Sequence, residues 1–184
     1  MVFGASRITP PALFHTPRLR LRRPVMADAP AIFHGYAQDP DVVRYVTWRP
    51  HVELATVEAF LARCLKQWEE GTEFTWAIQP ADGPAAIGAI GMRIKDHRAD
   101  LGYVLAKPYW GRGFMSEAVG ALVAWALAQP TIFRVWAICD VENVASARVM
   151  EKAGMQREGV LRRQIVHPNR SAEPRDCYVY SIVK

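Results

Sequence analysis

The sequence predicts a single α/β domain: a mostly antiparallel central sheet of six to seven strands, flanked by about four helices. Three observations support this prediction. The 184 residues suffice for one hydrophobic core. Strand-like and helix-like apolar patterns alternate along the chain, and short turn sequences join the central strand-like runs as in hairpins. We expect a flexible tail over residues 1–15 and the domain over residues 16–184.

The first half of the chain predicts one strand, two helices and three more strands. Residues 18–25 alternate as a strand with one wet face, and Asp28 is a suitable N-cap for the short helix that follows. Residues 52–71 have apolar side chains at spacings of three and four, typical of an amphipathic helix, which ends at Gly71. The three strands are expected at residues 74–78, 89–95 and 100–106.

The second half predicts a helix, a strand, another helix and two final strands. The first helix follows the stretch YWGRGFMSEA at residues 109–118 and stops before Pro130, which cannot continue it. The second begins at Asn143, a suitable N-cap, and ends at Gly154. The three strands are expected at residues 132–141, 155–166 and 176–183.

Charge and hydropathy argue against two classes of partner. The 23 basic and 18 acidic side chains give a net charge of +5, but no block of five or six like charges occurs. Nowhere do eighteen apolar residues run together, and the N-terminal dozen residues lack the apolar stretch of a signal peptide. We therefore expect no nucleic-acid partner and no membrane partner.

Cysteine and histidine usage points to a cytoplasmic protein without a metal. Cys64, Cys139 and Cys177 are too few, too scattered and too odd in number for a disulfide framework, so we interpret them as packing residues of a reducing compartment. The five histidines, His167 among them, have no metal-ligand spacing, and we interpret them as solvated or structural. The sequence leaves the oligomeric state open between a monomer and a homodimer.

Two glycines stand directly before a predicted helix, at Gly111 and Gly113. The first turn of a helix has N–H groups without an internal partner and a partial positive charge, and a residue without Cβ lets a phosphate approach the backbone. These residues predict an anion site, or else they only allow a tight strand-to-helix turn. A Walker loop is absent, and Ser116 stands where a dinucleotide fingerprint needs its third glycine.

The stretch resembles the pyrophosphate loop of the GNAT N-acetyltransferases, in particular the Rim-type branch of ribosomal-protein N-terminal acetyltransferases. The general loop pattern is Arg or Gln, two residues, Gly, one residue, Gly or Ala. Here WGRGFM places Trp110 at the polar start and Met115 at the small end. The YWG start and the Glu117–Ala118 pair match the Rim-type branch, LGYVL and NVASARVMEKAGM match on either side, and DPDVVRYVTWRP matches more loosely. The resemblance covers about residues 16–183.

The resemblance implies an acetyl-CoA-dependent acyltransferase that moves an acetyl group to a primary amine by direct attack in a ternary complex, without a metal. It also implies a backbone splay that pairs with the pantetheine arm, and Leu105 as the catalytic oxyanion donor. The CoA-binding residues that it implies are Val104, Leu105, Ala106, Trp110, Gly111, Arg112, Gly113, Phe114, Met115, Ser116, Asn143 and Ser146.

Many GNAT enzymes have a tyrosine that protonates the leaving thiolate, and this chain has Met150 at that position. The resemblance gives the role to Ser146, which donates to the sulfur directly or through water, and it gives Asn143 a contact with pantetheine or substrate. Simpler interpretations also exist. Asn143 is an adequate N-cap without any ligand, and a serine in a first turn often only reaches the backbone.

The base and the acceptor are the least determined parts of the expected reaction. Asp100 stands where family members often have a carboxylate; Glu73, Glu117, a water relay or an amine that arrives neutral are the alternatives. The α-amine of a peptide has a pKa of about 7.7–8.0, against about 10.4 for lysine, so a protein or peptide N-terminus suits a site without a strong base. Residues 42–51, which include Tyr45, Trp48 and Arg49, form either an aromatic wall for an incoming chain or ordinary packing.

Other functions stay open beside this one. The acceptor can instead be a small amine such as an antibiotic or a polyamine. An acyl-CoA-binding module without turnover is favoured by the missing tyrosine, and a basic nucleic-acid-binding domain is favoured by the net charge alone.

Overall fold

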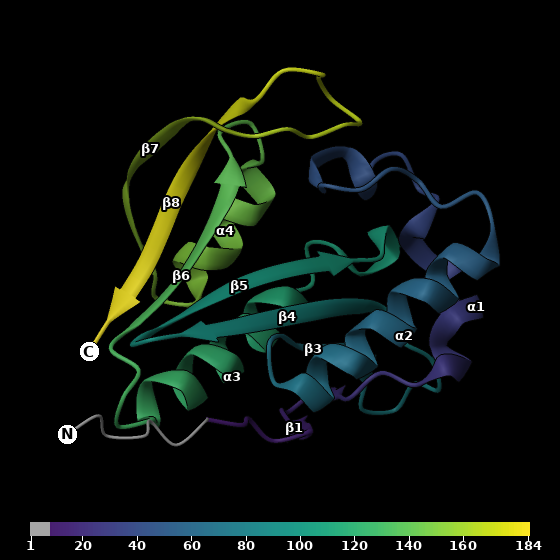
Figure 1. Cartoon of the computed structure of the whole chain (residues 1–184), viewed down its shortest axis with the longest axis horizontal. Helices are drawn as coiled ribbons and strands as arrows, with labels where there is room; N and C mark the ends of the chain where they lie inside the picture. Colours follow the sequence, from purple (N-terminus) through teal and green to yellow (C-terminus); the bar gives the residue numbers. More distant parts are fainter. Residues whose placement is uncertain (1–7) are drawn as a thin grey trace.

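A computed structural model describes residues 8–184, which form one eight-stranded sheet and four α-helices (Figure 1). Of the expected tail, residues 1–7 lie outside the described residues, whereas Leu13–His15 form strand β1. Phe14 pairs with Leu21 of the next strand, and its ring packs edge-on against Trp76 at 5.6 Å. The folded region therefore begins before residue 16, and β1 accounts for the strand beyond the expected six to seven.

The sheet confirms the mostly antiparallel α/β prediction. Its strand order is β1-β2-β3-β4-β5-β6-β8-β7, and every neighbouring pair is antiparallel except β5 and β6, which are parallel. A parallel pair needs a long crossover connection, and the helix that follows the glycine loop supplies it. The remaining strands are β2 (Leu19–Arg22), β3 (Phe74–Pro80), β4 (Gly88–Lys95), β5 (Arg98–Leu105), β6 (Arg134–Asp140), β7 (Gln156–Ile165) and β8 (Arg175–Val183).

The helices are α1 (Ala29–Ile32), α2 (Leu54–Glu70), α3 (Phe114–Ala128) and α4 (Val144–Lys152). Three of them follow the sequence closely: α2 ends at Gly71 in the left-handed region, α3 ends before Pro130, and α4 is capped by Asn143. Asp28 is the N-cap residue of α1, as expected, but its side chain makes no capping bond. Its carboxylate accepts instead from Arg22 and from the N–H of Val25. Among residues 8–184, no helix is both long and apolar enough to cross a bilayer.

Two hydrophobic clusters hold these elements together. The larger joins the inner face of the sheet to α3 through side chains such as Trp76, Ile90 and Leu122, all fully buried. The smaller joins α1 to α2 through Ile32 and Leu61. Apolar burial is the main favourable term in folding, so these two clusters fix the layers of the domain.

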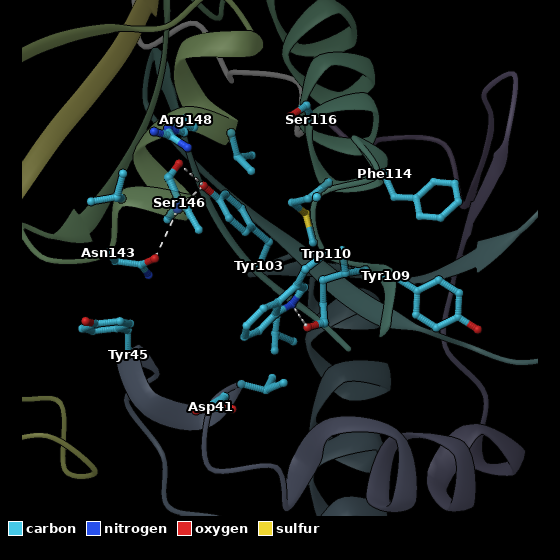
Figure 2. Close-up of a pocket in the computed structure, with 18 of the residues that line it drawn as sticks. Asp41, Tyr45, Tyr103, Tyr109, Trp110, Phe114, Ser116, Asn143, Ser146 and Arg148 are labelled. Atoms are coloured by element: carbon cyan, nitrogen blue, oxygen red, sulfur yellow. Dashed lines mark hydrogen bonds between the residues drawn. The ribbon is translucent and has the colours of Figure 1, made fainter. Parts of the chain in front are cut away.

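The sheet opens between β5 and β6. These strands pair only where Arg98–Asp100 face Arg134–Trp136, and beyond that point they diverge in a V (Figure 1). The C-terminal half of β5 therefore lacks a neighbour on one edge. Both the glycine loop and the start of α4 lie beside this gap (Figure 2).

Candidate active site

The glycine loop leads into α3 with its backbone donors unpaired. Gly111 has φ +71° and Gly113 has φ +80°, a left-handed conformation that glycine adopts without strain. Gly113 is the N-cap of the 15-residue α3, and the N–H of Glu117 donates to its carbonyl at 3.0 Å. The amides of residues 114–116 therefore have no acceptor inside the helix. The loop presents donors at the positive end of a helix dipole, as an anion requires.

Arg18 supports this loop from the sheet. Its Nη1 donates to the carbonyl of Arg112 at 2.9 Å, and its guanidinium lies over the ring of Phe114 at 4.7 Å. Its Nε donates to Glu117 at 2.7 Å, and the same carboxylate accepts from the Thr16 hydroxyl at 2.6 Å. Glu117, one of the expected base candidates, is thus an anchor between the start of β2 and the first turn of α3.

Replacing Glu117 with glutamine should destabilise the fold in a pH-dependent way. Burial acts to raise the pKa of Glu117, but hydrogen bonds from Thr16 and Arg18 outweigh it and hold the pKa below its usual value. A lowered pKa gives stability that is present above the unfolded value, about 4.3, and is lost as pH falls through the folded value. We expect Glu117→Gln to cost about 1–3 kcal/mol at pH 7, measured by urea unfolding.

The same measurement at pH 3 should give a smaller difference between wild type and Glu117→Gln, because the stability that a lowered pKa contributes shrinks once the pH falls below the unfolded-state value. Glu58→Gln is the matched control, since Glu58 is an exposed glutamate of α2 without an ion pair among the described residues. It should change stability by less than about 0.5 kcal/mol. An equal Glu117→Gln deficit at both pH values would contradict the anchoring role.

A cleft of about 650 Å³ opens beside the loop (Figure 2). Its walls come from the end of β5, the glycine loop, one side of α4 and a segment around Tyr45. The expected CoA-binding residues that line it are Val104, Leu105, Trp110, Gly111, Gly113, Phe114, Met115, Ser116, Asn143 and Ser146. These residues come from three separate parts of the chain and are brought together at the gap between β5 and β6.

Ala106 and Arg112 do not line the cleft. Ala106 is buried; its N–H donates to Ile87 at 2.8 Å, and its carbonyl accepts from Tyr109 at 3.0 Å, so both backbone groups already have partners. Arg112 is exposed and lies over the rings of Phe114 and Tyr109 at 5.0 and 5.7 Å. The structure therefore gives neither residue the ligand-facing position that the sequence predicts.

The backbone of Leu105 faces the gap. Because Ala106 donates toward β4 and successive peptide groups of a strand point to opposite edges, the N–H and carbonyl of Leu105 point away from β4. The carbonyl accepts the indole N–H of Trp110 at 2.7 Å (Figure 2). Within the described sheet no strand pairs with the N–H, since β6 has already diverged. This donor is free to bond an oxygen that becomes negatively charged in the cleft.

A pair of hydroxyl groups bridges β5 and α4 at the same place. The Tyr103 hydroxyl lies 2.8 Å from the Ser146 Oγ and also donates to the Ser146 carbonyl at 3.2 Å (Figure 2). The N–H of Ser146 donates to the Asn143 Oδ1 at 3.2 Å, so Asn143 caps α4 and also lines the cleft. Met150 is fully buried and lines neither cavity. Tyr103 and Ser146 are therefore the hydroxyl groups that the cleft presents at this place.

A second cavity, of about 390 Å³, meets the cleft at this pair. The two share Tyr45, Tyr103, Asn143 and Ser146 among their lining residues. The second cavity extends away from the glycine loop, toward side chains of the loop before α2, of α2, of the α2–β3 turn, of β3 and of the β7–β8 loop. In that order they are Trp48, Phe60, Glu73, Thr75 and His167. A molecule in each cavity would therefore reach the same pair of hydroxyl groups.

Comparison with known proteins identifies the family. Residues 18–156 match the model described as the acetyltransferase (GNAT) domain. The chain is 33% identical over 175 residues to YoaA of Bacillus subtilis (strain 168), named an uncharacterized N-acetyltransferase, covering 94% of this chain and 97% of YoaA. The chain belongs to the GNAT acetyltransferase family. It is an acetyltransferase, and enzymes of this family use acetyl-CoA.

Solved GNAT structures have the same fold. The microcin C7 self-immunity acetyltransferase MccE, in complex with acetyl-CoA and AMP, superimposes with a TM-score of 0.82 at 20% identity, covering 92% of this chain and 94% of MccE. A Salmonella typhimurium acetyltransferase that modifies the N-terminal serine of ribosomal protein L7/L12 gives 0.80 at 18% identity, over 92% and 96% of the two chains. At these identities the similarity establishes the shared fold.

The expected base candidates of this GNAT domain lie in three different places. Asp100 lines neither cavity, and its carboxylate accepts from Arg93 at 2.9 Å and 2.5 Å. Glu117 anchors β2, as described above. Glu73 lines the second cavity and accepts from Gln67 at 3.3 Å. Only Glu73 therefore has access to the place where the cavities meet.

Sequence reasoning missed several residues of the GNAT site. Arg148 and Lys152 line the cleft and stand four apart on α4, so helical spacing was the available signal. For Tyr103 the only signal was a hydroxyl group within an otherwise apolar strand. Arg18 and His167 left no local signal, because their partners are far away in the sequence.

The GNAT domain shows no activated cysteine near the site. Cys64, Cys139 and Cys177 are free and buried. Burial raises the pKa of Cys139 to about 12 and that of Cys177 to about 11, so both stay protonated thiols at neutral pH. Within residues 8–184, no three His, Cys, Asp or Glu side chains are arranged to hold a metal ion.

Proposed function

We propose that this GNAT enzyme transfers the acetyl group of acetyl-CoA to the α-amine of a protein or peptide N-terminus. In this proposal CoA binds in the cleft, and the acceptor enters through the second cavity. The observation that carries it is the meeting of the two cavities at the Tyr103–Ser146 hydroxyl pair. Direct transfer in a ternary complex needs such a meeting point, because the amine must reach the thioester carbonyl.

The chemistry of the cleft suits CoA. The pyrophosphate binds the unpaired amides of the glycine loop, where Gly111 has no atom within 4 Å of a built Cβ position and leaves the backbone accessible. Arg148 and Lys152 supply positive charge for phosphate groups from the opposite wall. The pantetheine arm then runs along the free edge of β5 toward the hydroxyl pair.

The reaction needs an oxyanion donor and a proton for the thiolate. The amine nitrogen attacks the acetyl carbonyl, whose oxygen becomes an oxyanion bonded by the N–H of Leu105. As the C–S bond breaks, Ser146 donates its proton to the sulfur and takes one from water, or from Tyr103, which solvent then reprotonates. Burial raises the pKa of Tyr103 well above its usual value, so its hydroxyl is protonated at neutral pH and gives up a proton only as it receives another.

The second cavity supports a peptide acceptor. Tyr45 and Trp48 line it, as expected for an aromatic wall beside an incoming chain, whereas Arg49 does not. Many α-amines are already neutral near pH 7–8, which lightens the demand on a base. A small cationic amine is the alternative acceptor, favoured by the carboxylate of Glu73 in the same cavity.

The test compares kcat/KM for short peptides that begin with Ser, Ala or Met with that for small amines such as spermidine and an aminoglycoside. N-acetylated peptides serve as blocked controls. We expect the free peptides to be preferred and the blocked ones to be inert. A small amine preferred by more than about a hundredfold would overturn the choice of acceptor and leave acetyl transfer intact.

Filling the second cavity should impair acceptor use alone. Gly102 of β5 lines only this cavity, and no atom lies within 4 Å of a built Cβ, so a larger side chain fits the fold and projects into the acceptor space. We expect Gly102→Val to raise the acceptor KM by about tenfold or more and to leave the Kd of acetyl-CoA unchanged. Steady-state kinetics and calorimetry measure the two.

Gly159→Val is the matched control for this substitution. Gly159 is also a strand glycine with open space around its Cβ position, and it lies on β7 away from both cavities. It should keep the wild-type acceptor KM. A Gly102→Val variant with the wild-type acceptor KM would show that acceptors do not use the second cavity.

A further inference from the structure

His167 has a buried ring nitrogen that no group in the described part of the chain satisfies. The side chain lies in the β7–β8 loop, is 4% exposed and lines the second cavity together with Tyr103 and Ser146. Its Nε2 is buried without a hydrogen-bond partner. Such atoms are rare in folded proteins, and one in the wall of a functional cavity points to a group that binds there.

The loop holds this ring in a fixed position. The Nδ2 of Asn169 donates to the carbonyls of Val43 and Trp48, at 2.7 and 2.8 Å, and so ties the loop to the opposite wall of the cavity. The carbonyl of His167 accepts from the N–H groups of Arg170 and Ser171 at 2.8 and 3.0 Å. The ring also packs edge-on against Tyr45 at 6.1 Å. A well-held side chain is suited to position a reacting atom.

The surroundings select the tautomer. Nδ1 lies 3.4 Å from the carbonyl oxygen of Val46, which can only accept, so the proton of the neutral ring belongs on Nδ1. Nε2 then has a free lone pair. Its nearest charged atom is the Asp140 Oδ2 at 3.7 Å, too far for a hydrogen bond.

Asp140 is placed to stabilise a protonated ring. Its side chain is fully buried and already accepts from Arg175 at 2.6 Å and from the N–H of Glu142 at 2.9 Å. It therefore does not need the histidine as a partner, but a positive charge on the ring would lie between this carboxylate and the Val46 carbonyl.

We propose that His167 is the general base of the transfer. The amine N–H of the acceptor donates to Nε2; as the nitrogen attacks the acetyl carbonyl and the C–S bond breaks, its proton passes to Nε2, while the sulfur takes a proton from Ser146. The imidazolium then returns its proton to solvent after the products leave. The inference rests on the proposed transfer to an amine in the second cavity, and it replaces our interpretation of the histidines as structural.

The charged and titratable groups around the His167 ring could also contribute to the pH dependence of the rate. Asp140 of β6 faces it directly, Arg175 of β8 and Glu142 lie behind Asp140, and Tyr45 covers one side. Glu73 lines the same cavity, at the end of α2 and the start of β3. Among these side chains histidine is the type that ordinarily changes charge between pH 5 and 8.

The test uses the chemical step. Single-turnover rates at saturating acetyl-CoA are measured from pH 5 to 9 with a short peptide that begins with serine, or with spermidine if the wild type prefers it. The wild-type rate should rise as two protons are lost, one from the acceptor amine, with a pKa of about 7.7–8.0 for the peptide, and one from His167 in a limb between pH 5 and 8. In His167→Gln the rate at pH 7 should fall by about 10²-fold or more, and the His167 limb should vanish while that of the amine stays.

The controls separate catalysis from structure. His97→Gln replaces an exposed histidine of the β4–β5 turn and should keep both the rate and the His167 limb. His167→Gln should bind acetyl-CoA with wild-type affinity. A rate within threefold of wild type, or a slower variant that keeps both limbs, would overturn the proposal. If the variant does not fold, the wild-type profile still tests the proposal, since a profile that shows only the limb of the acceptor amine would overturn it. Whether the proposed acceptor is correct is decided by a different measurement, the comparison of kcat/KM between peptides and small amines.

Discussion

Ser146→Ala is expected to lower kcat by about 10²-fold or more while the Kd of acetyl-CoA stays close to wild type. The serine lies where the two cavities meet, and its Oγ is 2.8 Å from the Tyr103 hydroxyl. Its removal takes away the group that we propose as proton donor to the thiolate. The fold should tolerate the change, because the Tyr103 hydroxyl keeps its bond to the Ser146 carbonyl at 3.2 Å.

Tyr103→Phe distinguishes a relay from a single donor. If Tyr103 resupplies Ser146, the single and double variants should lose similar amounts of kcat, because groups that act as a unit are not additive. Independent losses would place Tyr103 in a supporting role. A Ser146→Ala variant within about threefold of the wild-type kcat would contradict the assignment and give the proton transfer to water.

Gly113→Val is expected to weaken acetyl-CoA binding by at least about tenfold, measured by calorimetry. Gly113 has φ +80°, where a side chain costs about 1–2 kcal/mol, and its built Cβ lies 3.4 Å from the Arg18 Nη2. To relieve the strained φ the loop must move, and the amides that we propose bind the pyrophosphate move with it. One and a half kcal/mol corresponds to about tenfold in affinity.

Two other glycine variants make this test specific. Gly113→Asn should retain more affinity than valine, because asparagine tolerates the left-handed conformation. Gly120→Ala, on α3 with open space around its Cβ position, should leave binding unchanged and stabilise the helix slightly. A folded Gly113→Val variant with wild-type affinity would show that the loop does not hold the pyrophosphate.

The sequence was most informative where structure depends on neighbouring residues. The period of three and four in α2, its stop at Gly71 and the Asn143 cap of α4 are local, and the structure confirms them. β1 was missed because three residues are too short for a strand pattern; it exists through pairing with β2. Asp28 stands at the N-cap position as expected, but its carboxylate pairs with Arg22 of β2 and makes no capping bond, which no local pattern indicates.

The residues of the candidate site also fall into those that a local pattern predicts and those that only the fold brings together. The glycine loop is local, so its residues and their position before α3 could be predicted. Tyr103 and Ser146 are 43 residues apart, and His167 is 121 residues from Val46. No single-sequence pattern joins residues at such distances; only the divergence of β5 from β6 brings them to one place. Asp100 shows the reverse error, because family position suggested a base and the fold gave it Arg93 as a partner.

A covalent conjugate of CoA and a peptide should occupy both cavities at once if donor and acceptor meet at Tyr103 and Ser146. Its CoA sulfur is joined through an acetyl linker to the α-nitrogen of a short peptide that begins with serine, and its Kd is compared with that of CoA by calorimetry. We expect the conjugate to bind tighter than CoA by about 10²-fold or more, since linkage makes the second contact intramolecular. Gly102→Val should remove this gain and leave CoA binding intact. A conjugate that binds no tighter than CoA would show that the two cavities do not hold donor and acceptor side by side.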